Sequence, residues 1–188
     1  MTNSNFSRRA LTLSALASVA VAAACGNGIG GSGTATIDAR VQATLNEMYN
    51  SYPSTASLAR KANGMLVMPL VTEAGLGLGG AYGRGALLVG DTPVDYYSLT
   101  KASGGLQLGA QQHAHVLFFM TDQALNDFRR SRGWAAGADL EYVLNSSGDS
   151  LAADTTTLLS PVLAAVFGRT GLRIGVTLEG SKYTRIIP

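Results

Sequence analysis

The feature that most limits the possible folds of this chain is the glycine-rich stretch AGLGLGGAYGRG at residues 74–85. Its odd-numbered positions hold only glycine or alanine, whereas its even-numbered positions include Leu76, Leu78, Tyr82 and Arg84. A period of two is that of a β-strand, whose successive side chains point to opposite faces. Glycine is tolerated in a strand where another backbone comes close or the sheet bends sharply. The stretch therefore predicts a strand with one bare face that serves close packing.

Gly75, Gly77 and Gly80 in this stretch also match the G-x-G-x-x-G spacing of dinucleotide-binding loops. In those loops the glycines leave a strand and enter a helix. The residues that follow here, AYGRG, add two more glycines and are poor helix formers. The same spacing recurs within residues 26–31, in a flexible Gly/Ser/Thr segment. We interpret the glycines as a packing device, and we expect no cofactor.

The first 24 residues have the features of a secretory signal peptide. Arg8 and Arg9 give a positive start, and residues 10–24 form an apolar stretch of 15 residues that ends in small side chains. This stretch is shorter than the roughly 20 apolar residues of a membrane-spanning helix. Adjacent arginines also occur in twin-arginine signals, so the pattern leaves export by the Sec or the twin-arginine route open.

Cys25, the only cysteine, directly follows the apolar stretch. It has no possible disulfide partner within the chain, and small residues before such a cysteine resemble a bacterial lipoprotein signal, in which the cysteine is acylated. The alternative is a plain signal peptide with a chance cysteine. We expect a lipoprotein whose acyl chains anchor it in the membrane. Gly26, in place of an aspartate, indicates the outer membrane, with the domain facing the periplasm.

The charge of the remaining chain excludes one class of partner. The sequence has 14 basic residues (Lys and Arg) and 12 acidic ones, and because Arg8 and Arg9 leave with the signal, the rest is balanced. A neutral chain has no general electrostatic attraction to nucleic acid. Hydrophobic residues make up 46% of the sequence, which argues against disorder. We expect one domain over residues 37–188, preceded by a flexible tether over residues 25–36.

Helical patterns occupy the start and the middle of this domain. Residues 37–52 place apolar side chains at helical spacing, with Thr36 as the expected cap and Pro53 as the stop. A second, shorter helix is expected from Ser54 to Asn63-Gly64. A third is expected from Asp122, as its cap, to Gly133.

Period-two patterns predict that the rest of the domain is a sheet. Short turns that contain glycine join the strands, which favours antiparallel pairing. The expected fold class is α+β: a strongly curved, mostly antiparallel sheet, either a sandwich or a partly closed barrel, with N-terminal helices and one mid-chain helix packed on it. Besides residues 74–85, strands are expected at residues 65–71, 105–111, 116–121 and 171–180.

Catalytic patterns are weak throughout the chain. His113 and His115 would share one face of a strand and could hold a metal. No Cys, Asp or Glu lies beside them to complete a ligand set, so we expect two half-exposed histidines at the start of a strand. The G-x-S-x-G motif is absent, and the carboxylates are scattered. A metal-dependent hydrolase is the least favoured function, and we expect the protein not to be an enzyme.

Arg129, Arg130 and Arg132 crowd the last turn of the third expected helix. One explanation is that cations complement a helix C-terminus. The other is a site for anionic lipid headgroups, where each basic residue contributes ~1 kcal/mol. The chain also has aromatic residues of the kind found at membrane interfaces, although each could simply belong to the core. These aromatic residues are Tyr96, Tyr97 and Trp134, and the basic residues that could extend the site are Lys101, Arg169, Arg173, Lys182 and Arg185.

Five segments of the chain resemble the SYLF domain family in their order and spacing. The resemblance covers nearly all of residues 37–187. Bacterial members of the family are exported and often lipoproteins, and eukaryotic members couple the domain to lipid-recognition or actin-linked modules and bind anionic lipids such as phosphoinositides. Since phosphoinositides are not usual bacterial lipids, another phospholipid is the expected ligand. The segments are ANGMLVMP (62–69), AGLGLGGAYGRGALLV (74–89), ASGGLQLGAQ (102–111), VLFFMTDQALNDFRRSRGWAAGAD (116–139) and VFGRTGLRIGVTLEGSKYTRI (166–186).

The resemblance implies a non-enzymatic domain that binds anionic phospholipid headgroups through basic residues. Combined with the export signal, it predicts an envelope lipoprotein held at the membrane by Cys25. The alternative function is a structural or protein-partner module of the cell envelope.

Overall fold

The computed structural model of the protein describes residues 32–137, 140–142, 160–168 and 177–188. The predicted signal peptide and Cys25 lie outside these described residues, as do Arg169 and Arg173. Contacts divide the chain into Met1–Gly33 and Thr34–Pro188, and the fold described below is that of the second unit. Within the described ranges there are three helices and six strands.

Two helices open the fold, α2 (Ser32–Ser51) and α3 (Ser54–Lys61). α2 begins at Ser32, so the end of the predicted tether is helical, and Thr36 lies inside the helix and does not cap it. The buried stripe that starts at Ile37 fixes the helix against the core, and extending a formed helix by one turn costs far less than nucleating one. Pro53 separates the two helices, as the sequence predicts. Among the described residues, no helix has both the length and the apolar character needed to cross a membrane.

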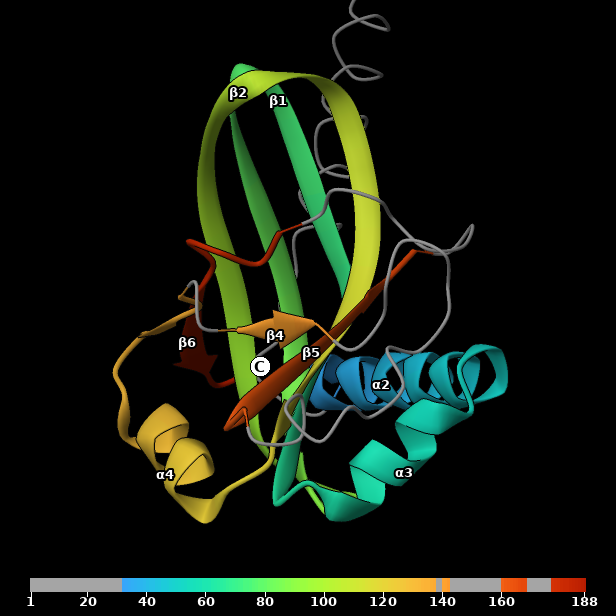
Figure 1. The fold of residues 1–188 in the computed structure, drawn as a ribbon. Coiled ribbons are helices and arrows are strands. Elements are labelled where there is room, and N and C mark those ends of the chain that lie inside the picture. Colours follow the sequence, from blue (N-terminus) through green and yellow to red (C-terminus); the bar gives the residue numbers. More distant parts are fainter. Residues whose placement is uncertain (1–31, 138–139, 143–159, 169–176) are drawn as a thin grey trace, which may run out of the picture. The chain divides into compact units, whose positions relative to one another are not determined.

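A long antiparallel hairpin forms the centre of the sheet (Figure 1). β1 (Gly64–Val89) and β2 (Thr92–Phe119) are paired along their length, and the turn between them contains Gly90 with a φ of 59°. The segments predicted as separate strands, 105–111 and 116–121, therefore belong to one continuous strand up to Phe119. They merge because residues 112–115 continue the extended alternation without a proline or a turn.

The predicted glycine strand lies within β1 and bends with its partner. Glycines stand opposite each other at the bend, where Gly75 pairs with Gly109 and Gly77 with Gly105, beside a shift in register after Leu76. Figure 1 shows the two strands arching over part-way along their length, in the part of the sheet far from α2 and α3. Because neither glycine of such a pair has a side chain, nothing obstructs the curvature there, and the paired glycines favour the bend.

Beyond the bend, the second half of β1 crosses close to its own first half. A Cβ atom added at Gly83 would lie 2.8 Å from the carbonyl oxygen of Leu70. A Cβ atom at Gly85 would collide with the carbonyl oxygen of Val67. These contacts confirm that Gly83 and Gly85 serve close backbone packing.

The other strands extend both arms of the hairpin. The order is β3-β6-β2-β5-β4, with β1 also paired to β2. Every pairing is antiparallel except that of β4 with β5, which confirms the α+β class with a strongly curved, mostly antiparallel sheet. The bounds are β3 (Trp134–Ala135), β4 (Glu141–Tyr142), β5 (Val162–Phe167) and β6 (Lys182–Ile186). The predicted strand at 171–180 is wrong over its described end, because Glu179-Gly180 form a turn that allows β6 to start at Lys182.

Alternate side chains of the sheet enter two hydrophobic clusters. Val67 and Phe118 belong to the cluster that includes the apolar stripe of α2. Leu66 and Phe119 belong to the cluster that includes α4 (Asp122–Arg130). The cap of α4 is not Asp122 but Thr121, whose hydroxyl oxygen accepts a hydrogen bond from the amide of Ala124 (3.2 Å). The helix ends at Arg130, before the predicted Gly133, because Ser131 is already extended.

Candidate functional site

Arg129 and Arg185, far apart in the sequence, meet at a single carboxylate. The Arg129 Nε atom lies 3.0 Å from Asp95 Oδ2, and an Arg185 Nη2 atom lies 2.9 Å from the same oxygen. The pairing of β2 with β6 brings Arg185 beside the start of β2, and the last turn of α4 supplies Arg129. The two guanidinium side chains remain 40% and 50% exposed, whereas that of Asp95 is 14% exposed. One partly buried carboxylate thus holds two outward cations side by side.

Lys182 lies next to the segment that follows α4. Its stem packs on Gly133, where an added Cβ atom would overlap the Lys182 Cε atom. The adjacent Arg132 is exposed, as is Arg130, and neither forms an ion pair with a residue in the described ranges. The structure therefore gathers five of the predicted basic residues around the end of α4. We call them the α4–β6 basic cluster: Arg129, Arg130, Arg132, Lys182 and Arg185.

The remaining predicted binding residues have structural roles or lie outside the described chain. The Lys101 ammonium donates a hydrogen bond to the carbonyl oxygen of Thr177 (2.6 Å), which ties β2 to the segment before β6. Tyr97 and Trp134 pack on Phe128, with ring centroids 4.7 and 5.5 Å from that of Phe128. Tyr97 belongs to the core, and Trp134 is partly buried against it. The Tyr96 hydroxyl donates to the Asp38 carboxylate and holds α2 on the sheet.

The expectation of half-exposed histidines at a strand start is wrong. His113 and His115 are 3% and 0% exposed and lie well inside β2, because this strand begins at Thr92. Their rings stack with centroids 5.6 Å apart, and His115 Nε2 lies 2.9 Å from the hydroxyl oxygen of Tyr183. In the described part of the chain, no three potential ligands of the His, Cys, Asp or Glu type gather to hold a metal. The pair is part of the core.

The burial of His115 predicts a loss of stability in mild acid. The loss of solvent on burial is the main cause that lowers the pKa of His115 well below 6.5, and the charge of the nearby His113 lowers it further. The unfolded chain therefore binds a proton below about pH 6.5 that the folded chain does not, so folding is fully favoured above that pH and weakens as the pH falls. We expect this group alone to remove about 1 kcal/mol of unfolding free energy between pH 6.5 and 5.5.

Urea unfolding of the His115→Gln variant isolates this contribution, since glutamine is neutral at both pH values. The unfolding free energy of the variant should fall less than that of the wild type across the same pH interval. Equal falls in the two proteins would contradict a neutral, buried His115.

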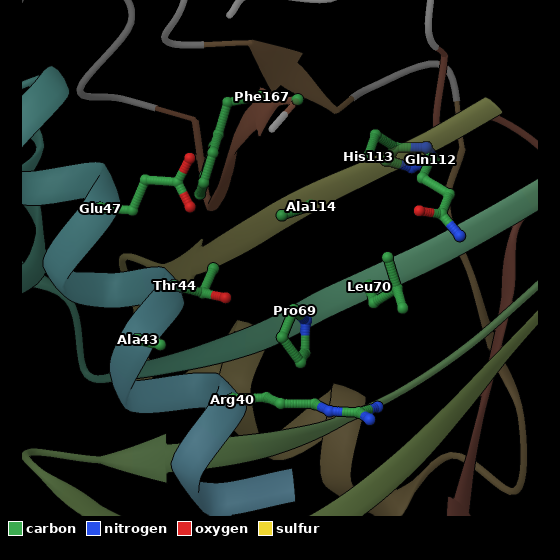
Figure 2. Close-up of a pocket in the computed structure, with 11 residues that line it drawn as sticks. Arg40, Ala43, Thr44, Glu47, Pro69, Leu70, Gln112, His113, Ala114 and Phe167 are labelled. Carbon is green, nitrogen blue, oxygen red and sulfur yellow. The ribbon is translucent and has the colours of Figure 1, made fainter. Parts of the chain in front are cut away.

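A separate pocket of about 240 Å³ lies between α2 and the sheet. Figure 2 shows the α2 side chains facing residues of β1 and β2, with Phe167 of β5 at one end. From α2 the pocket is lined by Arg40, Ala43, Thr44 and Glu47, and from the sheet by Pro69, Leu70, Gln112, His113, Ala114, Phe167 and Gly168.

A β-bulge shapes the sheet side of this pocket. Met68 pairs with His115 and Val71 with His113, so the two residues Pro69 and Leu70 stand opposite the single residue Ala114. Proline has no amide hydrogen to donate to a ladder, and it is therefore accepted where the pairing is already interrupted. A bulge bends its strand and redirects side chains, which places Pro69 and Leu70 at the pocket wall.

This pocket is not among the sites predicted from the sequence, although part of its signal is present there. Arg40, Thr44 and Glu47 have the i, i+4, i+7 spacing that places residues on one face of a helix. The sequence shows neither the bulge nor the part of the sheet that this helix face contacts.

The comparison with protein families is consistent with this structure. Residues 100–185 match the family model described as Ysc84: Las17-binding protein actin regulator, which represents the SYLF domain. This match assigns residues 100–185 to the SYLF domain family. No curated protein matches the chain. All five members of the α4–β6 basic cluster lie within the part of the SYLF domain that matches, whereas the α2 wall of the pocket precedes it.

Proposed function

We propose that this protein is a bacterial envelope lipoprotein whose SYLF domain binds anionic phospholipid headgroups and catalyses no reaction. Acylated Cys25 would anchor the chain in the outer membrane, with the domain facing the periplasm. Support for the anchor comes from the sequence of residues 1–25, where a positive start and an apolar stretch precede the cysteine.

The observation that carries the headgroup proposal is the α4–β6 basic cluster. Asp95 offsets two of its cations, and Arg130, Arg132 and Lys182 are exposed without an ion pair to a described residue. Asp127 lies one turn before Arg130 on α4, and the five cations still outnumber Asp95 and Asp127 together. Guanidinium groups form paired hydrogen bonds with phosphate oxygens. A surface of this kind suits several lipid phosphates better than a single deeply bound ligand.

Removal of the three unpaired cations should greatly weaken binding to anionic vesicles. We expect Arg130→Gln, Arg132→Gln and Lys182→Gln together to reduce the partition coefficient onto phosphatidylglycerol-containing vesicles roughly 100-fold, at ~1 kcal/mol for each basic residue. Arg129 is retained because its guanidinium binds Asp95. Vesicle co-sedimentation measures the effect, which should shrink at high salt.

A matched variant separates a local site from a general effect of charge. Arg60→Gln, Lys61→Gln and Arg84→Gln remove three exposed cations outside the cluster, and this variant should retain most of the binding. Equal losses in the two triple variants would contradict a specific role for the cluster.

The description of the matched family favours a second candidate function. It names a protein partner and the regulation of actin for the proteins it describes. We therefore consider a protein-partner module of the envelope as the alternative. Under this alternative, neither triple variant changes vesicle binding, and an envelope protein binds to the wild type but not to the variant that lacks the cluster cations.

A further inference from the structure

The pocket beside α2 combines a cation and an anion that form no ion pair with a described residue. Arg40 and Glu47 stand at exposed positions about 10 Å apart along the helix axis, which is seven residues at 1.5 Å each. Neither side chain forms an ion pair or hydrogen bond with another side chain in the part of the protein that the structure describes. The wall opposite them carries no charged side chain. Both charges are therefore available to a ligand.

Neutral groups lie between these two charges. Thr44, halfway along the row, is only 7% exposed, and Figure 2 shows its hydroxyl oxygen directed toward the pocket. The amide of Gln112 adds a donor and an acceptor on the opposite wall, and Pro69 and Phe167 provide apolar surface. A matching ligand has opposite charges at its ends and a short neutral centre with both carbon and oxygen atoms.

We propose that this pocket binds a small zwitterion in which a phosphate is joined to a primary ammonium group by a short neutral linker, as in phosphoethanolamine. The Arg40 guanidinium donates paired hydrogen bonds to the phosphate oxygens. The Glu47 carboxylate accepts hydrogen bonds from the ammonium group, which has three donors. The Thr44 hydroxyl and the Gln112 amide contact the linker oxygens, and Phe167 covers the linker carbons.

The charges and the volume disfavour other ligand classes. Glu47 repels a polyanion such as a multiply phosphorylated headgroup. A divalent metal ion prefers several oxygen ligands, and Glu47 is the single carboxylate among the lining residues. The volume of about 240 Å³ lies below the ~300–1,000 Å³ of pockets for larger organic ligands, which excludes nucleotides.

Two sources can supply this chemistry: a soluble glycerophosphodiester or the headgroup of a phosphatidylethanolamine membrane. The inference does not depend on the proposed function, since the pocket and the α4–β6 basic cluster share no residue. Loss of anionic-vesicle binding would leave the zwitterion proposal intact, and the reverse also holds.

Calorimetric titration of the full-length protein with three probes tests the proposal. Glycerophosphoethanolamine carries both charges, glycerol 3-phosphate only the anion, and ethanolamine only the cation. We expect the first to bind at least about tenfold more tightly than either of the others. Glu47→Gln should remove its advantage over glycerol 3-phosphate, and Arg40→Gln should weaken both phosphate probes at least about tenfold.

Arg60→Gln and Glu179→Gln serve as matched controls, because they remove the same charges at exposed positions that do not line the pocket. Both controls should bind all three probes like the wild type, and unchanged thermal unfolding midpoints would verify the fold of every variant. Co-sedimentation with vesicles of phosphatidylcholine and phosphatidylethanolamine, sensitive to Glu47→Gln, would identify the headgroup as the source. Binding of the soluble probe alone would identify the glycerophosphodiester. Absence of saturable binding, or equal effects of Glu47→Gln and Glu179→Gln, overturns the proposal.

Discussion

Replacement of Gly85 by alanine is expected to lower the free energy of unfolding by about 3 kcal/mol. The new Cβ atom would collide with the carbonyl oxygen of Val67 and would lie 2.7 Å from the Met68 sulfur. The sulfur can move, but the carbonyl belongs to a paired strand and cannot shift without separating the two halves of β1. Denaturant unfolding of the variant measures the loss directly.

Gly80→Ala on the same strand is the matched control. The Cβ atom added there meets only the carbonyl oxygen of Lys101, at 3.2 Å, and alanine suits an exposed strand position no worse than glycine does. We expect a change of less than about 1 kcal/mol. If the two alanine variants unfold at the same denaturant concentration, the close crossing at Gly85 does not exist in solution.

Phe128→Ala should cost about 3–5 kcal/mol, because it removes a ring at the centre of an aromatic cluster. Phe128 is fully buried, and its ring centroid lies 4.7 Å from those of Tyr97 and Phe119. Trp134 and Tyr183 contact the same ring, with centroids 5.5 and 6.3 Å away. The surrounding rings are held by different elements and cannot all collapse into the cavity. Equilibrium unfolding in urea measures this cost.

Tyr82→Ala removes an aromatic ring of similar size that is 54% exposed, and it should change stability by less than about 0.5 kcal/mol. Comparable losses in Phe128→Ala and Tyr82→Ala would show that the cluster around Phe128 does not hold α4 on the sheet.

The sequence predicts those parts of the fold that depend on local patterns. The alternation around Gly83 and Gly85 predicts a strand. The glycines also predict its close packing, because a side chain at either position would clash with the neighbouring backbone. The apolar spacing after Ile37 likewise identifies α2, and Pro53 marks its end. Period and chain-breaking residues are properties of a few neighbouring positions, and a single sequence displays them.

Features that depend on distant pairing could not be predicted in the same way. Arg129 and Arg185 meet because β2 places Asp95 between them, and nothing near either arginine indicates this partner. His115 is buried because it lies inside the continuous strand β2 and because Tyr183 of β6 packs on it. The pocket needs the bulge at Pro69 as well as α2. Each case combines segments whose register the local pattern does not contain.

The shared use of β1 and β2 by both arms of the sheet has a consequence for cooperativity. One arm adds β5 to the end of β2, and the other adds β6 near its beginning, so neither arm has a hairpin of its own. Unfolding of either arm removes hydrogen bonds and apolar contacts that the other arm needs, which favours all-or-none unfolding. The segment that matches the family model, residues 100–185, lacks all of β1, so we expect that it does not fold without the rest of the hairpin.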